Sequence, residues 1–242
     1  MHLLTRIAVL AVLLFAGNGC LHSKFGDFKL PKSTKAEEKP GETAAVSETE
    51  LSGKPAATLA LTMAEELEKA GKDGDAIAYY EKARAADPTA NAKAARRLAV
   101  LYDRAGDPGK AMQEFRELLK TKPKDPDLLN DIGYSHYNRN EWTEAETHFR
   151  KALDYDKTHK RAWVNLGLTL AQQGRTDESL SAFEKAVSPA EAKSNLAFVL
   201  ATQGKRDAAT NLYREALSAD STLKSAQTAL AALEKATAVE GN

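Results

Sequence analysis

The feature that most constrains the fold is an internal repeat with a period close to 34 residues. Residues that favour turns recur at Gly71, Gly106, Asn140, Gly174 and Gly204, in steps of 35, 34, 34 and 30 residues. Glycine and, less often, asparagine accept the left-handed backbone conformation that ends a helix. Each of these residues therefore predicts a point where one helix ends and the chain reverses into the next. A period of this length indicates one supersecondary unit stacked several times.

Small and aromatic residues return in register with these turns. The residue five positions after each turn is small, the one nine positions after is aromatic, and the one seven positions before is small again. In chain order the three sets are Ala76, Ala111, Ala145, Ser179 and Ala209; Tyr80, Phe115, Phe149, Phe183 and Tyr213; and Ala64, Ala99, Gly133, Gly167 and Ala197. Offsets of three and four residues place side chains on one helix face. We expect the small residues to let two helices approach and the ring to fill the space beside the next pair.

Composition and local signals agree with an all-α chain. Alanine, the best helix former, dominates much of the sequence after residue 56, and no stretch alternates β-branched with polar residues as a strand would. Asp107-Pro108 has the form of a helix cap followed by a first-turn proline. Ser188-Pro189-Ala190-Glu191 has the form of a capping box.

The repeated pattern resembles the tetratricopeptide repeat. The fullest match is Trp163-Val164-Asn165-Leu166-Gly167 followed by Gly174, Ser179, Phe183 and Ala186, and other repeats add Pro88 and Pro123 at their closing position. The resemblance covers about 70% of the chain and implies a solenoid of antiparallel helix pairs with about five repeats. We place the repeats at 57–90, 92–125, 126–159, 160–189 and 190–223.

Three departures from the repeat carry structural expectations. The fourth repeat lacks four residues, close to one helical turn, which predicts a shortened second helix there. The third and fifth repeats have Lys157 and Ser221 in place of the closing proline. Residues 224–242 are expected to form a capping helix and tail that cover the apolar edge of the last repeat.

The first 19 residues have the layout of a signal peptide. Arg6 precedes the apolar run Ile7 to Ala16, and small residues lead directly to Cys20, the only cysteine. This ending resembles the lipobox of bacterial lipoproteins, although Gly17 stands where that site prefers leucine. The resemblance implies lipidation of Cys20 and a lipoprotein that faces the periplasm, and Leu21 favours the outer membrane. The alternatives are ordinary signal-peptidase cleavage, which gives a secreted or soluble periplasmic protein, and an uncleaved anchor.

Residues 20–56 are expected to form a disordered tether. They are rich in Lys, Glu, Thr, Ser, Pro and Gly, and their apolar content is too low to offset the entropy cost of ordering. As a coil, about 35 residues would span roughly 30–35 Å. The tether would hold the repeats away from the membrane and allow them to reorient.

The resemblance implies a partner-binding surface on the concave face, which the first helix of each pair lines in this family. The corresponding residues are Lys93, Arg96, Val100, Asn130, Tyr134, Tyr137, Arg161, Asn165, Asn195 and Phe198. Asparagine, arginine and tyrosine side chains suit the capture of an extended peptide. The alternative is that these residues are simply solvated. The carboxylate clamp of chaperone-binding relatives is not reproduced, because Asp131 and Tyr134 stand where it requires asparagine.

We find no pattern typical of catalysis or of cofactor binding. The five histidines show no metal-ligand spacing, and there is no glycine loop for phosphates and no nucleophile motif. The formal net charge is zero, so no overall field draws the chain to nucleic acid. We therefore predict no enzymatic activity, no cofactor or metal, no nucleic-acid partner and no small-molecule substrate.

The function that follows is a membrane-tethered scaffold or adaptor for protein or peptide partners. Bacterial lipoproteins of this architecture include ones that assist pilus secretins, tight-adherence machinery and outer-membrane protein insertion, so a role in an envelope assembly is expected. The alternative is a regulatory subunit of a cell-wall enzyme.

Overall fold

The computed structural model describes residues 52–240, which lie in one compact unit formed by Ser52–Asn242. In this part of the chain there are eleven α-helices, one short 3-10 turn and no strand. The elements are α2 (Gly53–Lys69), α3 (Asp73–Ala86), η1 (Pro88–Ala90), α4 (Asn91–Arg104), α5 (Pro108–Thr121), α6 (Pro126–Asn138), α7 (Trp142–Tyr155), α8 (Lys160–Gln172), α9 (Thr176–Glu184), α10 (Pro189–Thr202), α11 (Arg206–Ala219) and α12 (Lys224–Glu240). The predicted signal peptide, Cys20 and most of the predicted tether lie outside the described residues.

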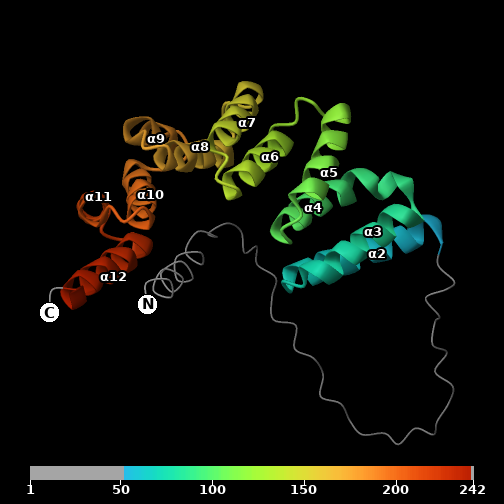
Figure 1. Cartoon of the computed structure of the whole chain (residues 1–242), viewed down its shortest axis with the longest axis horizontal. Coiled ribbons are helices and arrows are strands. Elements are labelled where there is room, and N and C mark those ends of the chain that lie inside the picture. The colour runs from blue at the N-terminus through green and yellow to red at the C-terminus, as the bar shows by residue number, and fades with distance from the viewer. Residues whose placement is uncertain (1–51, 241–242) are drawn as a thin grey trace, which may run out of the picture. The chain divides into compact units, whose positions relative to one another are not determined.

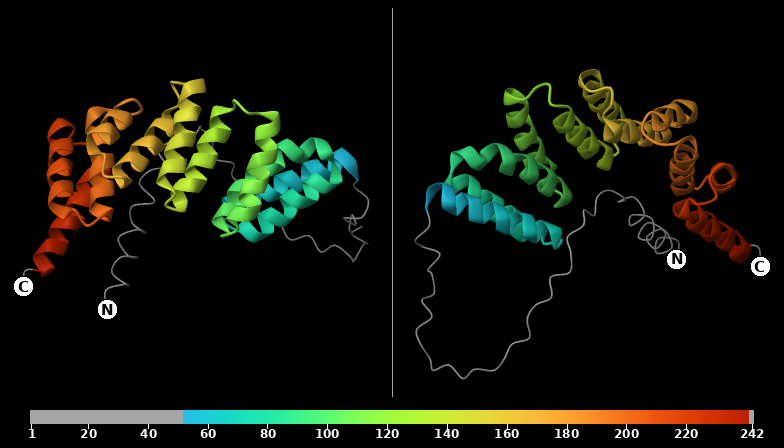
Figure 2. Two further views of the ribbon diagram at one scale, coloured as in Figure 1. Left: turned by 45° about the horizontal axis from the view of Figure 1, so that its top comes forward. Right: turned by 180° about the vertical axis from the view of Figure 1, so that it is seen from behind.

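The ten helices from α2 to α11 form five antiparallel pairs that stack one after another (Figures 1 and 2). The first helices of the pairs (α2, α4, α6, α8 and α10) lie on the inner side of this curved row, and the second helices lie on its outer side (Figure 1). The final helix, α12, packs against α10 and α11. The prediction of an all-α solenoid with a C-terminal capping helix is confirmed.

Each pair reverses through the same turn. Gly71, Gly106, Gly174 and Gly204 have positive φ angles, and Asn140 has a φ of 61°. The amide after each turn residue donates to a carbonyl five residues earlier, as Lys72 N does to Leu67 O at 2.9 Å and Glu141 N to His136 O at 3.0 Å. This is the Schellman arrangement, which satisfies the last carbonyls of the first helix.

The small and aromatic residues pack as the sequence predicts. The five aromatic residues that stand nine positions after each turn are all buried, and so are the small residues five positions after each turn. The ring of Phe183 lies directly against Gly167, where an added Cβ would come within 2.7 Å of it. Gly133 has the same relation to Phe149. In these two pairs the aromatic ring of the second helix therefore packs on the backbone of the first, with no side chain between them.

The predicted shortening in the fourth repeat is confirmed. Helix α9 has 9 residues, whereas the other second helices have 14. The removed turn lies after Phe183, so the packing contact with Gly167 is kept. The chain then enters α10 through the predicted capping box, in which Ser188 and Glu191 cap each other's backbone amides.

Aspartates, rather than prolines alone, fix the turns between pairs. Asp87, Asp156 and Asp220 each accept a hydrogen bond from the amide two residues later, at 2.8–2.9 Å. Proline follows only the first of them. The aspartate side chain mimics a backbone turn, so Lys157 and Ser221 can replace the closing proline without loss of the turn.

One predicted boundary is wrong. Helix α2 begins at Gly53, so residues 53–56 belong to the first helix and not to the tether. The prolines of residues 20–56, which include Pro55, are among the residues on which the tether prediction rests. Proline is nevertheless tolerated in the first turn of a helix, because the amide there has no intrahelical acceptor.

The longest helices within residues 52–240 are α2 and α12, at 17 residues each. Among the described residues, no helix combines the length and hydrophobicity needed to cross a lipid bilayer.

Replacing Gly167 with alanine tests the contact between ring and backbone. The new Cβ would meet the Phe183 ring at 2.7 Å, so helices α8 and α9 must separate or the ring must move. We expect the free energy of unfolding to fall by about 1–3 kcal/mol, measured by urea denaturation followed by circular dichroism.

Gly74→Ala is the matched control. Its Cβ would meet nothing within 4 Å, so alanine should be neutral there or stabilise by up to about 1 kcal/mol. Equal effects of the two substitutions would contradict the packing argument.

Candidate functional site

All ten residues predicted to line the concave face lie on first helices. Lys93, Arg96 and Val100 are on α4, Asn130, Tyr134 and Tyr137 on α6, Arg161 and Asn165 on α8, and Asn195 and Phe198 on α10. We call this surface the inner wall. It has two rows, one polar and one mostly apolar.

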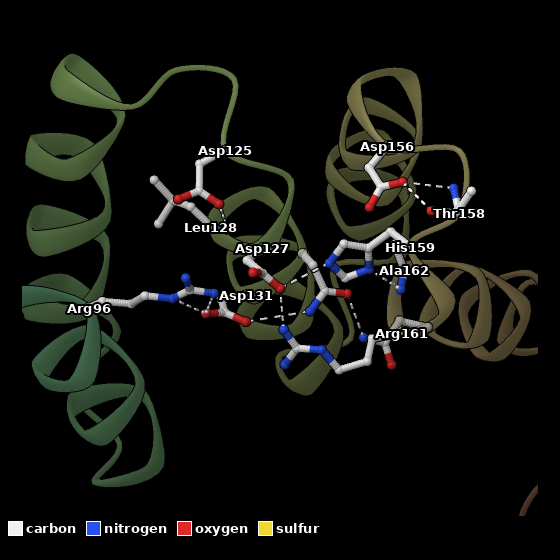
Figure 3. Close-up of polar contacts among 12 residues, drawn as sticks. Arg96, Asp125, Asp127, Leu128, Asp131, Asp156, Thr158, His159, Arg161 and Ala162 are labelled. Atoms are coloured by element: carbon white, nitrogen blue, oxygen red, sulfur yellow. Dashed lines mark hydrogen bonds and ion pairs between the residues drawn. The ribbon is translucent and has the colours of Figure 1, made fainter. Parts of the chain in front are cut away.

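The polar row is joined by hydrogen bonds between neighbouring first helices. The Arg96 Nε atom donates to Asp131 Oδ2 at 2.8 Å, which links α4 to α6 (Figure 3). The amide of Asn165 donates to Asn130 Oδ1 at 2.9 Å, which links α6 to α8. Asn130 is only 3% exposed, so it supports Asn165 and is not itself open to a partner.

Asp127, at the start of α6, holds the beginning of α8. It accepts hydrogen bonds from His159 Nε2 at 3.1 Å and from Arg161 (Figure 3). The other ring nitrogen of His159, Nδ1, accepts from the amide of Ala162 and so caps α8. Burial raises the pKa of Asp127, but the bonds from His159 and Arg161 outweigh it and hold the pKa below its ordinary value.

The apolar row lies one helical turn further along the same helices. Tyr134 follows Asn130 by four residues and Val100 follows Arg96 by four, while Phe198 follows Asn195 by three. Tyr134 is 47% exposed, whereas Val100 and Phe198 are partly buried against the core. Leu168 continues this row on α8 and was not among the predicted residues.

Tyr134 belongs to a small aromatic cluster. Its ring is stacked on that of Tyr137, with centroids 6.1 Å apart and planes 11° from parallel. Trp142, at the start of α7, meets Tyr137 edge-on at 5.0 Å. Burial raises the pKa of Tyr137, whose hydroxyl accepts a hydrogen bond from Gln172 at 3.4 Å. Trp142 and Gln172 therefore hold Tyr137 in place, and Tyr134 remains exposed on top of it.

Sequence reasoning missed the partners that order the polar row. Asp127 and His159 lie at the starts of helices, where such residues are common and indicate no partner. Trp142 lies just after a turn. The offset of 32 residues between Asp127 and His159 was a usable signal, because residues about one period apart lie on adjacent pairs. Of the remaining predicted residues, Lys93 pairs with Glu65 at 2.6 Å and Asn195 is half-buried on α10.

The described chain also has two open cavities of about 380 Å³ each, the first of which includes Lys93 of the inner wall in its lining. The first cavity is lined by charged residues of α2 and α4 and by Tyr80 of α3, and its Arg97 and Lys93 are paired with Glu68 and Glu65. No group of three or more His, Cys, Asp or Glu side chains within residues 52–240 could hold a metal ion.

The second cavity is on the outer side and is lined by residues of α5, α6 and α7 and of the chain between α5 and α6. His148 lines it and stacks on His136 with centroids 5.3 Å apart. Burial, with smaller contributions from the nearby His136 and Lys151, lowers the pKa of His148 to about 4. His148 is therefore uncharged in the folded chain near neutral pH.

Comparison with known proteins identifies the repeat. Residues 67–130, 130–197 and 190–219 each match a sequence profile described as tetratricopeptide repeat. No curated protein sequence matches the chain.

Solved structures show the same fold. The chain is similar to a thermophilic tetratricopeptide-repeat protein of Thermus thermophilus, with 17% identity, a TM-score of 0.57, and coverage of 73% of this chain and 98% of that one. It is also similar to the MamA protein, at 22% identity and a TM-score of 0.52 over 67% and 91% of the two chains. It is similar to pilF of Pseudomonas aeruginosa at 23% identity and a TM-score of 0.53, with coverage of 66% of this chain and 74% of that one. At these identities the likeness establishes the fold alone.

His148 makes stability depend on pH. The unfolded chain binds a proton on this residue near pH 6.5, whereas the folded chain does so only near pH 4. The unfolded state therefore holds more protons between these values, and the free energy of unfolding should fall as the pH drops from about 6.5 to about 4.

His148→Phe keeps a flat ring against His136 and removes the titrating group. We expect this variant to lose less stability between about pH 7 and about pH 5 than the unsubstituted chain, measured by urea denaturation. Parallel pH profiles for the two proteins would show that His148 does not carry the effect.

Proposed function

Because the chain belongs to the tetratricopeptide repeat family, we propose that it is a non-enzymatic scaffold that holds an extended segment of a partner protein against the inner wall. Proteins built from this repeat bind protein or peptide partners through stacked helix pairs. The observation that supports this surface is the combination of an ordered polar row with the exposed ring of Tyr134 beside it. Such aromatic side chains provide much of the affinity at protein interfaces.

The charged groups of the described chain support a binding role over a catalytic one. Arg139 pairs with Asp103 at 2.8 Å, and Arg175 pairs with Glu146 at 2.8 Å, so both arginines tie one helix pair to the preceding pair. In the polar row Arg96 is paired with an aspartate of the following helix pair, and Arg161 with one of the preceding pair. These groups have structural partners, and we assign none of them a role as acid, base or nucleophile.

We further propose that the scaffold is tethered to a bacterial membrane through lipidated Cys20 and takes part in an envelope assembly such as secretion, pilus formation or outer-membrane biogenesis. The support is the signal-peptide layout of residues 1–19 and the small residues before Cys20. A regulatory subunit of a cell-wall enzyme is the second candidate, since the same surface could hold such an enzyme.

Replacing Cys20 with alanine in the full chain tests the anchor. We expect the protein to leave the membrane fraction and to lose labelling by a fatty-acid analogue, because the residue that carries the anchoring acyl chains is gone. A variant that is still labelled and sediments with membranes would contradict the role of Cys20.

Affinity capture from solubilised membranes with residues 52–242 tests the binding surface. We expect the unsubstituted bait to retain a specific partner, identified by mass spectrometry, and Tyr134→Ala to retain at least about fivefold less because the exposed ring is lost. A secretin or barrel protein as partner would support the envelope-assembly role, and a hydrolase or synthase would support the second candidate.

Tyr155→Ala is the matched control for this capture. Tyr155 is 51% exposed and lies on α7, a second helix, so its removal takes a similar ring from the outer side. Equal losses for Tyr134→Ala and Tyr155→Ala, or none for either, would contradict a partner site on the inner wall.

A further inference from the structure

The spacing of the apolar row restricts what kind of peptide can bind there. Val100, Tyr134, Leu168 and Phe198 stand at the same place on four successive first helices, α4, α6, α8 and α10. Each is at least partly exposed. A peptide that crosses these helices therefore meets one apolar side chain per helix.

The first helices of neighbouring pairs contact each other from α4 to α10. Packed helices have axes about 8–10 Å apart, so the apolar side chains recur at about that distance. A polyproline II segment rises about 3.1 Å per residue with three residues per turn, which returns the same face every 9.3 Å or so. In a β-strand the same face returns after about 6.8 Å, which does not match the row.

The polar row suits such a segment as well. A polyproline II backbone makes no internal hydrogen bonds, so its carbonyls are free to accept from side-chain amides. Asn165 and Asn195 lie one turn before the apolar residues Leu168 and Phe198. Asn165 is held in place by its bond to Asn130, which makes it a fixed donor or acceptor beside the row.

Charge complementarity points to an uncharged segment. Lys93, Arg96 and Arg161 on the inner wall are paired with Glu65, Asp131 and Asp127. A charged peptide would have to displace one of these pairs, whereas a neutral one leaves them intact. Binding should consequently depend little on salt.

We propose that the inner wall selects an uncharged polyproline II segment of the partner that carries an apolar side chain at every third position. This inference rests on the proposed function and names the chemistry of the segment. Tyr134 is the central contact, because its ring is exposed and stacked on Tyr137, as in the aromatic grooves that generally receive proline-rich peptides.

Two labelled peptides of equal composition test the proposal. The first is four repeats of Pro-Pro-Leu, and the second has the same prolines and leucines with the leucines in adjacent pairs. With residues 52–242, fluorescence anisotropy should show the periodic peptide binding about tenfold tighter than the paired one. Tyr134→Ala should weaken the periodic peptide by about tenfold. Tyr155→Ala and about 0.5 M NaCl should change its affinity by less than about twofold.

Equal affinity for the two peptides, absence of binding, or indifference to Tyr134→Ala would overturn the proposal. Dimerisation of the chain in sedimentation that Tyr134→Ala abolishes would also overturn it, because a second copy would then occupy the wall. If membrane capture depends on Tyr134 while the periodic peptide fails to bind, this inference falls and the scaffold function stands. If capture does not depend on Tyr134 and the periodic peptide also fails to bind, the scaffold function at the inner wall is contradicted as well.

Discussion

The structure depends on one contact, between an aromatic ring on the second helix of a pair and a small residue on the first. It is direct in the pairs α6–α7 and α8–α9, and the same residue types are buried at these positions in the other three pairs. Burial of a ring and close approach of two backbones are achieved together, because glycine or alanine leaves room for the ring. The contact fixes the distance between the two helices of a pair. It also shapes the surface on which the next pair packs. A displaced ring in one pair would therefore disturb the packing of the neighbouring pairs.

The inner wall is a consequence of this stacking. Residues one period apart lie at equivalent places on successive first helices, so side chains distant in sequence form continuous rows. The bonds from Arg96 to Asp131 and from Asn165 to Asn130 cross from one pair to the next. A long peptide can therefore contact several first helices at once, although no single pair contains a complete site. Shortening of α9 leaves the rows intact because the removed turn lies after the ring.

Much of the fold was predictable because the periodic residues are the ones that determine packing. Turns, buried rings, the short α9 and the capping box at Ser188 all follow from residue type and spacing. The start of α2 was predicted too late, since Pro55 signals a break but also fits a first helical turn. In the inner wall, helix and face were predictable for Tyr134 and Asn165. The offset of about one period between Asp127 and His159 places them on adjacent pairs, but the burial of Asn130 and the geometry of the bonds to Asp127 were not predictable. Those depend on how far neighbouring helices are rotated, which no single repeat specifies.

Native-state hydrogen exchange of Phe149→Ala in residues 52–242 tests the central contact most directly. Phe149 is fully buried and belongs to a core cluster that includes Leu129 of α6 and Leu166 of α8. If the ring holds both its own pair and the next one, exchange should accelerate in α6, α7 and α8 while α2 and α3 keep their protection. Acceleration confined to α7, or none at all, would contradict the view that these rings determine how the pairs stack.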